Sequence, residues 1–463
     1  MIDLLIAGGL IVTLDAQRRV IDDGAVAVDG DRILSVGPRV ELERTVSARR
    51  TLDARRRVVR PGYVDAHVHV TAEMLARGFV PDSVGQRAWI REWATPLYAA
   101  TEPEEEYVAA LLASIELLRN GITSFCDGGT IRHAGRVARA VDEVGIRGVL
   151  GRWTWDLVAE PASLFQTTDQ ALAATEDLID RIHGSANGRI RAMAAVINVE
   201  TASERLLRGL RELAERRAVL LNFHQSAYAE YVPDALAIWG ARPIEHLRDL
   251  GLLGPRLRLV HMNYVDEGEI ELLRASDTRV VHCPGTAFRL AYGAGPHGRF
   301  PEMLAAGITV GLGTDGADAG DQLDLSRAMY LAAGLFKDSR QDPSCLPAET
   351  ALEMATLHGA RSIAWDDEIG SLEPGKKADI VLLDRERPEM VPIVNVANCL
   401  VYAADGRAVD TVLVDGKIIV EGGHVTTVDE REVYQQVERI CPRLLARSGL
   451  PLERRWPVEH VRA

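Results

Sequence analysis

The sequence predicts an α/β protein: a (β/α)8 TIM barrel with a small discontinuous β-sandwich domain built from both termini. One observation is the length of 463 residues, enough for such a barrel and a companion domain. Another is the middle of the chain, residues 59–366, where short apolar runs alternate with segments of helical periodicity. The third is period-two apolar patterning, bounded by Gly and Asp, in residues 1–58 and 367–425.

Eight segments of the middle region are apolar enough and short enough to be barrel strands. They span residues 63–69, 121–129, 146–155, 190–200, 218–225, 257–263, 278–285 and 308–316. Amphipathic stretches separate them, which is the alternation that a (β/α)8 barrel requires. The connection after the first strand, residues 70–120, is long, and long connections in compact domains are typical of lids and binding loops.

The two β-rich flanks, residues 1–58 and 367–425, are too small to bury a core separately, so we expect them to form one sandwich together. Residues 426–463 are predicted to form a C-terminal helix and tail. This segment could cover either the barrel or a neighbouring subunit.

Composition restricts the class of protein. The formal net charge is −14 and the basic runs are short, which argues against nucleic-acid binding. The five cysteines are scattered without a CxxC pair, which argues against a disulfide framework and a thiolate zinc site. No run approaches the roughly 18–20 apolar residues of a membrane span, and the N-terminus resembles a strand rather than a signal peptide. We therefore expect a cytoplasmic enzyme that acts on a small molecule.

Polar side chains gather at the carboxyl ends of the predicted barrel strands, where the active sites of such barrels form. They are His67, His69, His224, His261, His282 and Asp315. His67 and His69 are two apart on one strand, so both can point into the barrel mouth. Imidazole nitrogens with an added carboxylate suit Zn2+, Fe2+, Co2+ or Mn2+, and such a metal lowers the pKa of a bound water toward about 7.

Five segments resemble the amidohydrolase superfamily, in the order found there. PGYVDAHVH, HCPGTAFRL and GITVGLGTDG are similar to its motifs on barrel strands 1, 7 and 8. EPGKKADIVLLD and VDTVLVDGK resemble the companion sandwich of its cytosine-deaminase and chlorotriazine-hydrolase branch. The resemblance covers nearly the whole chain.

The resemblance implies one divalent metal ion per subunit, Zn2+ before Co2+, Mn2+ or Fe2+, held by His67, His69, His224 and Asp315. Asp315 would also take the proton of the attacking water and deliver it to the leaving nitrogen. His261 would hydrogen-bond the water or the substrate. His282 would polarise the substrate carbonyl or stabilise its oxyanion. The fourth strand ends in INVE, without the lysine of binuclear relatives, which favours a mononuclear site.

One departure from the family pattern bears on the substrate. Ring-deaminating and dechlorinating relatives carry HxxE after strand 5, and here Ala227 stands in place of that glutamate. A carbonyl needs no such ring-nitrogen proton donor, so we expect hydrolysis of a non-peptide C–N bond in an amide, urea or carbamate. The pattern resembles the branch of phenylurea hydrolase and molinate hydrolase.

Two alternatives stay open. One is deamination of an amino-substituted heterocycle of purine, pyrimidine or triazine type, which ammonia release would reveal. The other is a non-catalytic, amidohydrolase-like assembly protein, which the absence of bound metal and of activity would reveal.

The candidate substrate-binding residues are Asn222, Trp155, Glu200, Arg289 and Tyr292, each at or just after a predicted strand end. Each of three residues also has a role that involves no substrate. Asn222 could equally donate a supporting hydrogen bond, Glu200 could form a salt bridge within its loop, and Trp155 could pack between the barrel and a helix. By analogy with relatives, we expect a homo-oligomer.

Overall fold

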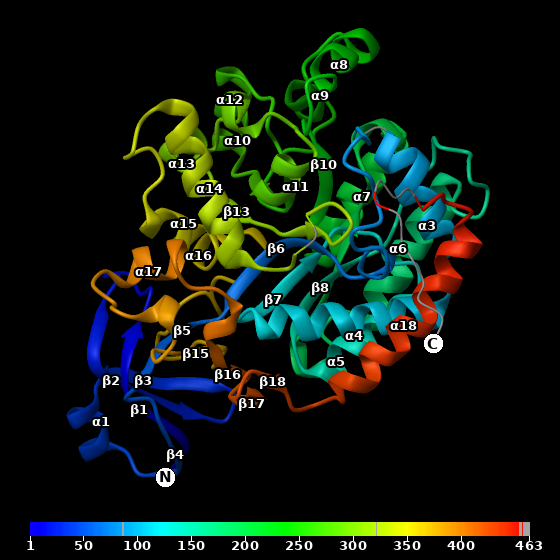
Figure 1. Ribbon diagram of the computed structural model, residues 1–463. Coiled ribbons are helices and arrows are strands. Elements are labelled where there is room, and N and C mark those ends of the chain that lie inside the picture. The colour runs from blue at the N-terminus through cyan, green and yellow to red at the C-terminus, as the bar shows by residue number, and fades with distance from the viewer. Residues whose placement is uncertain (86–87, 321, 453–455, 457–463) are drawn as a thin grey trace.

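The computed structural model describes residues 1–85, 88–320, 322–452 and 456 (Figure 1). Its centre is a parallel sheet with the strand order β13-β12-β11-β10-β9-β8-β7-β6-β14. The strands are β6 (Tyr63–His69), β7 (Ile122–Asp127), β8 (Arg147–Gly151), β9 (Ile190–Ala195), β10 (Leu221–Gln225), β11 (Leu257–His261), β12 (Arg279–His282), β13 (Val310–Leu312) and β14 (Asp315–Gly316). Only Gly313 and Thr314 separate β13 from β14, so the first and last strands of the sheet meet and the barrel closes.

Each of the eight predicted strand segments contains an observed strand. The first coincides with β6, because DAHVH is buried on both faces inside the barrel. The eighth, predicted as one strand over 308–316, is interrupted between β13 and β14. The interruption brings Asp315 beside Val68 in the register of β6, at the barrel mouth.

Helices surround the barrel and fill its connections (Figure 1). They are α4 (Pro103–Arg119), α5 (Ala134–Val144), α6 (Thr168–Ile182), α7 (Glu204–Arg217), α8 (Tyr231–Trp239), α9 (Pro243–Asp249), α10 (Glu267–Ser276), α11 (Pro284–Arg289), α12 (Ala294–His297), α13 (Phe300–Ala305), α14 (Leu325–Arg340), α15 (Ala348–Met354) and α16 (Leu357–Ser362), with the short turns η3 (Ala186–Gly188) and η4 (Val199–Thr201). The helix α4 shows why these segments are helical: Pro103 occupies its first turn and Glu102 and Glu105 form a capping box.

The long connection after β6 folds over the barrel mouth. It contains the 3-10 turn η1 (Ala72–Leu75), the π-helical turn η2 (Trp89–Ala94) and the helix α3 (Thr95–Ala100). Trp89, Trp93, Leu97 and Tyr98 are buried in the main hydrophobic core, so this connection is part of the packed domain.

The two ends of the chain form one continuous sheet with the path β18-β17-β16-β15-β5-β1-β2-β3, and β4 pairs with β1. Its strands are β1 (Ile2–Val12), β2 (Val20–Asp29), β3 (Arg32–Pro38), β4 (Ala48–Asp53), β5 (Arg57–Pro61), β15 (Ile380–Asp384), β16 (Val409–Val414), β17 (Lys417–Glu421) and β18 (His424–Val425), accompanied by α1 (Arg39–Thr45), α17 (Val396–Tyr402), η5 (Pro388–Met390) and η6 (Gly406–Ala408). β15 pairs antiparallel with β5, which joins the two ends of the chain. The predicted boundary between the first part of the sandwich and the barrel, at residue 58, falls inside β5.

A buried ion cluster links the barrel to this sheet. Arg147, at the start of β8, donates two hydrogen bonds of 3.0 Å to Asp379, which precedes β15, and a third of 2.5 Å to Asp415. Arg147 is 1% exposed and Asp379 3%, so neither charge is accessible to water.

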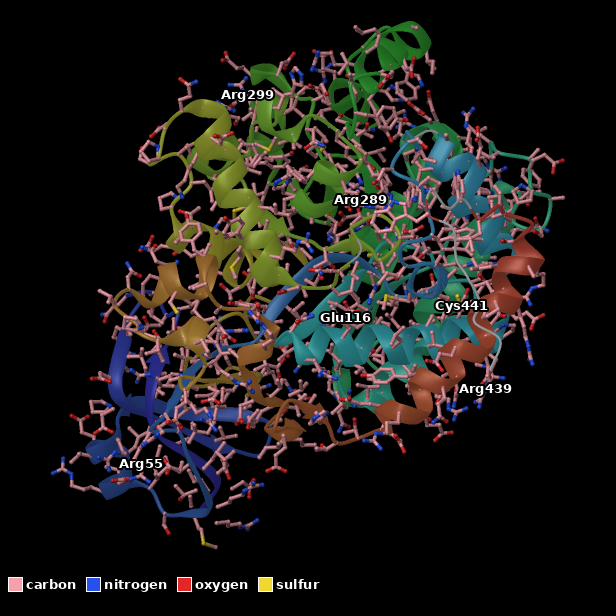
Figure 2. The ribbon with its side chains drawn as sticks, in the orientation of Figure 1. Arg55, Glu116, Arg289, Arg299, Arg439 and Cys441 are labelled. Carbon is pink, nitrogen blue, oxygen red and sulfur yellow. The ribbon has the colours of Figure 1, made fainter. Side chains whose placement is uncertain are left out.

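The C-terminal helix α18 (Glu430–Ser448) covers the barrel rather than projecting away from it (Figure 1). The Cys441 thiol donates to Leu75 O at 3.0 Å, on the side of α18 that faces the barrel (Figure 2). Arg447 donates to Ala100 O at 2.7 Å and thereby joins the last turn of α18 to the end of α3. Within the described residues no helix is long and apolar enough to cross a membrane.

Candidate functional site

Three imidazoles and one carboxylate converge at the barrel mouth. His67 and His69 end β6, His224 lies on β10 and Asp315 begins β14. His67 Nε2 lies 3.2 Å from His224 Nε2 and 3.5 Å from Asp315 Oδ1, and His69 Nε2 lies 3.2 Å from Asp315 Oδ1. Three strands that are far apart in the sequence, β6, β10 and β14, thus supply a single cluster.

The cluster fits a divalent metal ion. Ligand atoms held tetrahedrally at about 2.0–2.1 Å from zinc lie about 3.3 Å from one another, which matches the three distances above. Burial lowers the pKa of His67 to about 3 and that of His224 well below its usual range, so both rings are neutral and have a lone pair to offer. The donor set, imidazole nitrogen with carboxylate oxygen, is one that Zn2+ prefers.

Asp315 is the acidic member of the cluster. Burial by itself would raise the pKa of its carboxyl, but hydrogen bonding with His67 and His69 holds that pKa well below the usual value. Its backbone adopts a left-handed φ of 67°. Such a conformation is unfavourable for a non-glycine residue and is typical of functional sites.

His261 stands beside the cluster at the end of β11. Its Nε2 lies 4.0 Å from Asp315 Oδ2, and its ring stacks on that of His224 with centroids 5.4 Å apart. It also has a positive φ, 78°. Burial lowers the pKa of its imidazole, so His261 is a neutral ring that can exchange hydrogen bonds with a molecule beside Asp315.

Asp65 holds the backbone segments that carry His67 and Asp315 in place. Its carboxylate accepts hydrogen bonds from the backbone N–H of His67 at 3.1 Å, from Thr314 N at 3.1 Å and from the Thr314 hydroxyl at 2.6 Å. It therefore joins β6 to the residue that precedes Asp315. Burial raises the pKa of Asp65 to about 7 despite these bonds.

A group of carboxyls surrounds the other side of His69. Its Nδ1 lies 3.3 Å from Thr130 Oγ1 and 3.4 Å from Glu73 Oε1. Glu73 is fully buried, and burial together with the charge of Asp318 raises the pKa of its carboxyl well above the usual value. A Cβ at Gly316 would come within 1.8 Å of Glu73 Oε2, so glycine is required at this position for Glu73 to fit.

Two cavities lie above the cluster. The inner one, the metal chamber, has a volume of about 30 Å3, close to that of one water molecule. It is lined by His69, Glu73, Trp89, Ile90, Ala94, Tyr98, Thr130, Trp153, Ile197, Asn198, His224, Tyr231, His261, Tyr292 and Asp315. The outer one, the vestibule, has about 1110 Å3 and includes Arg132, His133, Trp155, Glu160 and Glu200 in its wall. Ile90 and Asn198 line both cavities and separate them.

The structure distributes the predicted substrate-binding residues over different places. Tyr292 lines the metal chamber, and its ring contacts His261 edge to face. Trp155 and Glu200 line the vestibule. Asn222 is fully buried, donates to Gly128 O at 3.4 Å and lines neither cavity. Whether these residues contact substrate stays a prediction.

His282 and Arg289 lie apart from the chamber. The His282 ring stacks on Phe300 with centroids 3.9 Å apart and has no hydrogen-bond partner among the described residues. It ends β12, but Phe300 of α13 packs against it and it does not line the metal chamber. Its contact with a substrate carbonyl stays a prediction. Arg289, on α11 (Figure 2), donates to the carbonyls of Val80 and Asp318 at 2.9 and 2.8 Å and lines a separate cavity.

Ala227 occupies the place where HxxE relatives carry glutamate. It is fully buried in an apolar cluster with Tyr231, Ala287 and Tyr292. Glu230 does not take its place, because it stands at the start of α8 and does not line the chamber.

Sequence reasoning missed several residues around the cluster. Asp65 precedes His67 by two residues and shares its face of the strand, a period-two signal that was available. Asp318 and Glu73 lie on connections whose course the sequence does not reveal. Cys283 was also missed: its Sγ lies within 4.8 Å of ligand atoms of His67 and Asp315, and burial raises the pKa of this thiol well above its usual value.

A closed parallel barrel with three imidazoles and a carboxylate at its mouth defines a metal-dependent hydrolase. Residues 58–419 match the family model described as "Amidohydrolase family", and the chain belongs to this family. It is an enzyme that hydrolyses C–N bonds other than peptide bonds.

The relatives include named deaminases. A protein of Syntrophobacter fumaroxidans named 5-methylthioadenosine/S-adenosylhomocysteine deaminase is 36% identical over 95% of this chain and 98% of its own. A protein of Nitratidesulfovibrio vulgaris with the same name is 35% identical over 96% and 99%. These findings favour the deaminase alternative over the amide, urea or carbamate expectation.

Solved structures agree with the fold. An adenosine deaminase from Xanthomonas campestris with bound zinc has a TM-score of 0.89 at 30% identity, over 96% of this chain and 99% of the other. An atrazine chlorohydrolase from Arthrobacter aurescens complexed with zinc has a TM-score of 0.86 at 24% identity, over 95% and 100%, and shows the fold alone.

Proposed function

We propose that the protein removes an amino group from an amino-substituted heterocycle by hydrolysis, with zinc as its metal ion. The observation that carries the proposal is the likeness to named deaminases over nearly the whole chain, at 36% identity. In this reaction water adds to the ring carbon, the C–N bond breaks, and the products are a ring carbonyl and ammonia.

The residues of the cluster would have two roles, metal binding and proton transfer. His67, His69, His224 and Asp315 would hold the zinc ion, which when bound lowers the pKa of water toward about 7. Asp315 Oδ2 accepts the proton of the attacking water and returns it to the leaving nitrogen, because a carboxylate in the cluster lies within reach of both groups. His261, 4.0 Å from the same oxygen, orients the reacting groups.

A second candidate is hydrolysis of an amide, urea or carbamate, and Ala227 favours it. The side chain at this position is apolar and buried, so it cannot protonate a ring nitrogen. A substrate carbonyl does not need that proton.

A panel of substrates distinguishes the two candidate functions. Zinc-loaded protein is incubated with adenosine-, cytosine- and melamine-type compounds and, separately, with phenylureas, carbamates and anilides, and released ammonia and amines are quantified. Ammonia from an aminated heterocycle, absent with Asp315→Asn, supports the proposal. Aniline or alkylamine from the second group, with no ammonia from the first, would establish the second candidate instead.

A further inference from the structure

The lining of the metal chamber contains aromatic side chains whose hydrogen-bond donors are unused. Trp89, Tyr98 and Trp153 are 9%, 2% and 4% exposed. The two indole N–H groups and the phenol O–H have no hydrogen-bond partner among the residues that the structure describes. Buried donors are almost always paired in native proteins, so three unpaired donors around one chamber indicate a partner that comes from outside the chain.

These three side chains form one surface. Trp89 comes from η2, Tyr98 from α3 and Trp153 from the segment after β8. The rings of Tyr98 and Trp153 lie with centroids 4.8 Å apart, inclined at 49°. Flat apolar faces with donors at their edges suit a planar molecule that carries acceptors at its own edge.

Several other polar groups of the chamber are already engaged. Asn198 donates to the Tyr231 hydroxyl at 3.3 Å and accepts from Thr201 N at 3.1 Å. His69, His224 and Asp315 belong to the metal cluster. Among the described residues of the chamber lining, unpaired polar atoms remain on Trp89, Tyr98 and Trp153, and also on Glu73 and His261. The indole and phenol donors are the ones carried by large flat rings.

We propose that Trp89, Tyr98 and Trp153 form the surface that binds the substrate's ring, and that their donors select a planar ring with acceptor nitrogens or oxygens over a hydrocarbon ring. This inference rests on the proposed function and assigns the residues that would bind the ring of its substrate. At about 30 Å3 the chamber does not hold a ring as it stands. The chamber therefore has to widen on binding, and Ile90 and Asn198 line both it and the vestibule.

The test compares two probes of the same shape, benzimidazole, which has an acceptor ring nitrogen, and indole, which has none. Calorimetric titration of the zinc-loaded full chain measures their affinities. We expect benzimidazole to bind more tightly, and Trp153→Phe or Tyr98→Phe, which remove a donor but keep a ring, to weaken it by about three- to tenfold without affecting indole. Coordination of benzimidazole by zinc adds to its affinity over indole but is common to all variants, so the difference between the variants carries the test.

Trp365→Phe is the matched control, because Trp365 is a buried tryptophan whose indole N–H is also unpaired among the described residues, but which packs on Arg191 away from the chamber. Melting temperature and zinc content establish that each variant is folded and loaded, and Trp89→Phe replaces any variant that is not. Equal affinity for the two probes, no binding of benzimidazole, or equal effects of Trp365→Phe and Trp153→Phe would overturn the proposal. Since binding is measured without turnover, these outcomes are independent of ammonia release, which tests the proposed function.

Discussion

Asp315 Oδ1 lies 3.2 Å from His69 Nε2, across the seam where the last strand of the barrel meets the first. The contact depends on closure of the barrel, because β14 pairs only with β6. It places the carboxylate against two imidazoles of one strand end, and this arrangement underlies the first two predictions.

Replacing Asp315 by Asn should lower kcat by about 10²- to 10⁴-fold, because the amide cannot accept the proton of the attacking water. The change keeps the size of the side chain, so the melting temperature of the metal-free protein should shift little. Rates of product release and zinc content by atomic absorption are the measurements. Asp82→Asn is the control, since that side chain is 93% exposed. Turnover near the wild-type rate would contradict the assigned proton transfer.

Removal of metal should lower the melting temperature, and added zinc should restore it by about 5 °C or more, because a ligand that binds only the folded state stabilises it. His224→Ala should abolish this response. His282→Gln should keep it, since His282 packs on Phe300 rather than in the cluster. Scanning calorimetry with and without chelator measures both, and loss of the zinc response in His282→Gln would place that residue in the metal site after all.

Arg147→Ala should destabilise the protein by about 3–5 kcal/mol, because it leaves the buried carboxylates of Asp379 and Asp415 without their cation. Asp177→Ala, which breaks a pair whose side chains are 72% and 54% exposed, should cost less than about 1 kcal/mol. Urea unfolding followed by circular dichroism gives both values. Similar costs for the two variants would mean that the ion cluster between barrel and sheet contributes little.

Glu106 should make stability fall as the pH rises from about 4.5 to about 7. Burial raises the pKa of its carboxyl from 4.5 to about 7, despite hydrogen bonds from the backbone of Arg132 and His133. Between these values the folded state binds more protons than the unfolded state, so raising the pH favours unfolding, and the effect levels off above about 7.

The measurement is the unfolding free energy of wild type and Glu106→Gln over this pH range. The stability of the wild type relative to the variant should decrease as the pH rises, because glutamine does not titrate. Glu104 lies nearby on the surface, so the unfolding free energy of Glu104→Gln should change with pH in the same way as that of the wild type. A constant difference between wild type and Glu106→Gln would show that the carboxyl titrates at an ordinary pH.

Much of the site followed from local patterns. The DAHVH strand end placed His67 and His69 on one face, and the order of the motifs placed His224, His261 and Asp315 at other strand ends. His282 also ends a strand but does not line the chamber, because whether such a side chain faces the chamber depends on the helix that packs over it. The same holds for Arg289, whose donors bind carbonyls of segments far away in the chain.

The substrate class was the weakest inference from the sequence. Ala227 by itself favours a carbonyl substrate, whereas the likeness to named deaminases extends over 95% of the chain. The structure adds the donors of Trp89, Tyr98 and Trp153, which were not recognisable as a group since they come from three separate segments.

The sequence by itself determined the barrel, the terminal β domain and the members of the metal cluster, because strand periodicity and motif order are local properties of the chain. Tertiary structure alone decided which side chains share the chamber, how Glu73 and Asp318 surround His69, and which strand end α13 covers. These depend on contacts between residues distant in sequence, whose distances no local pattern encodes.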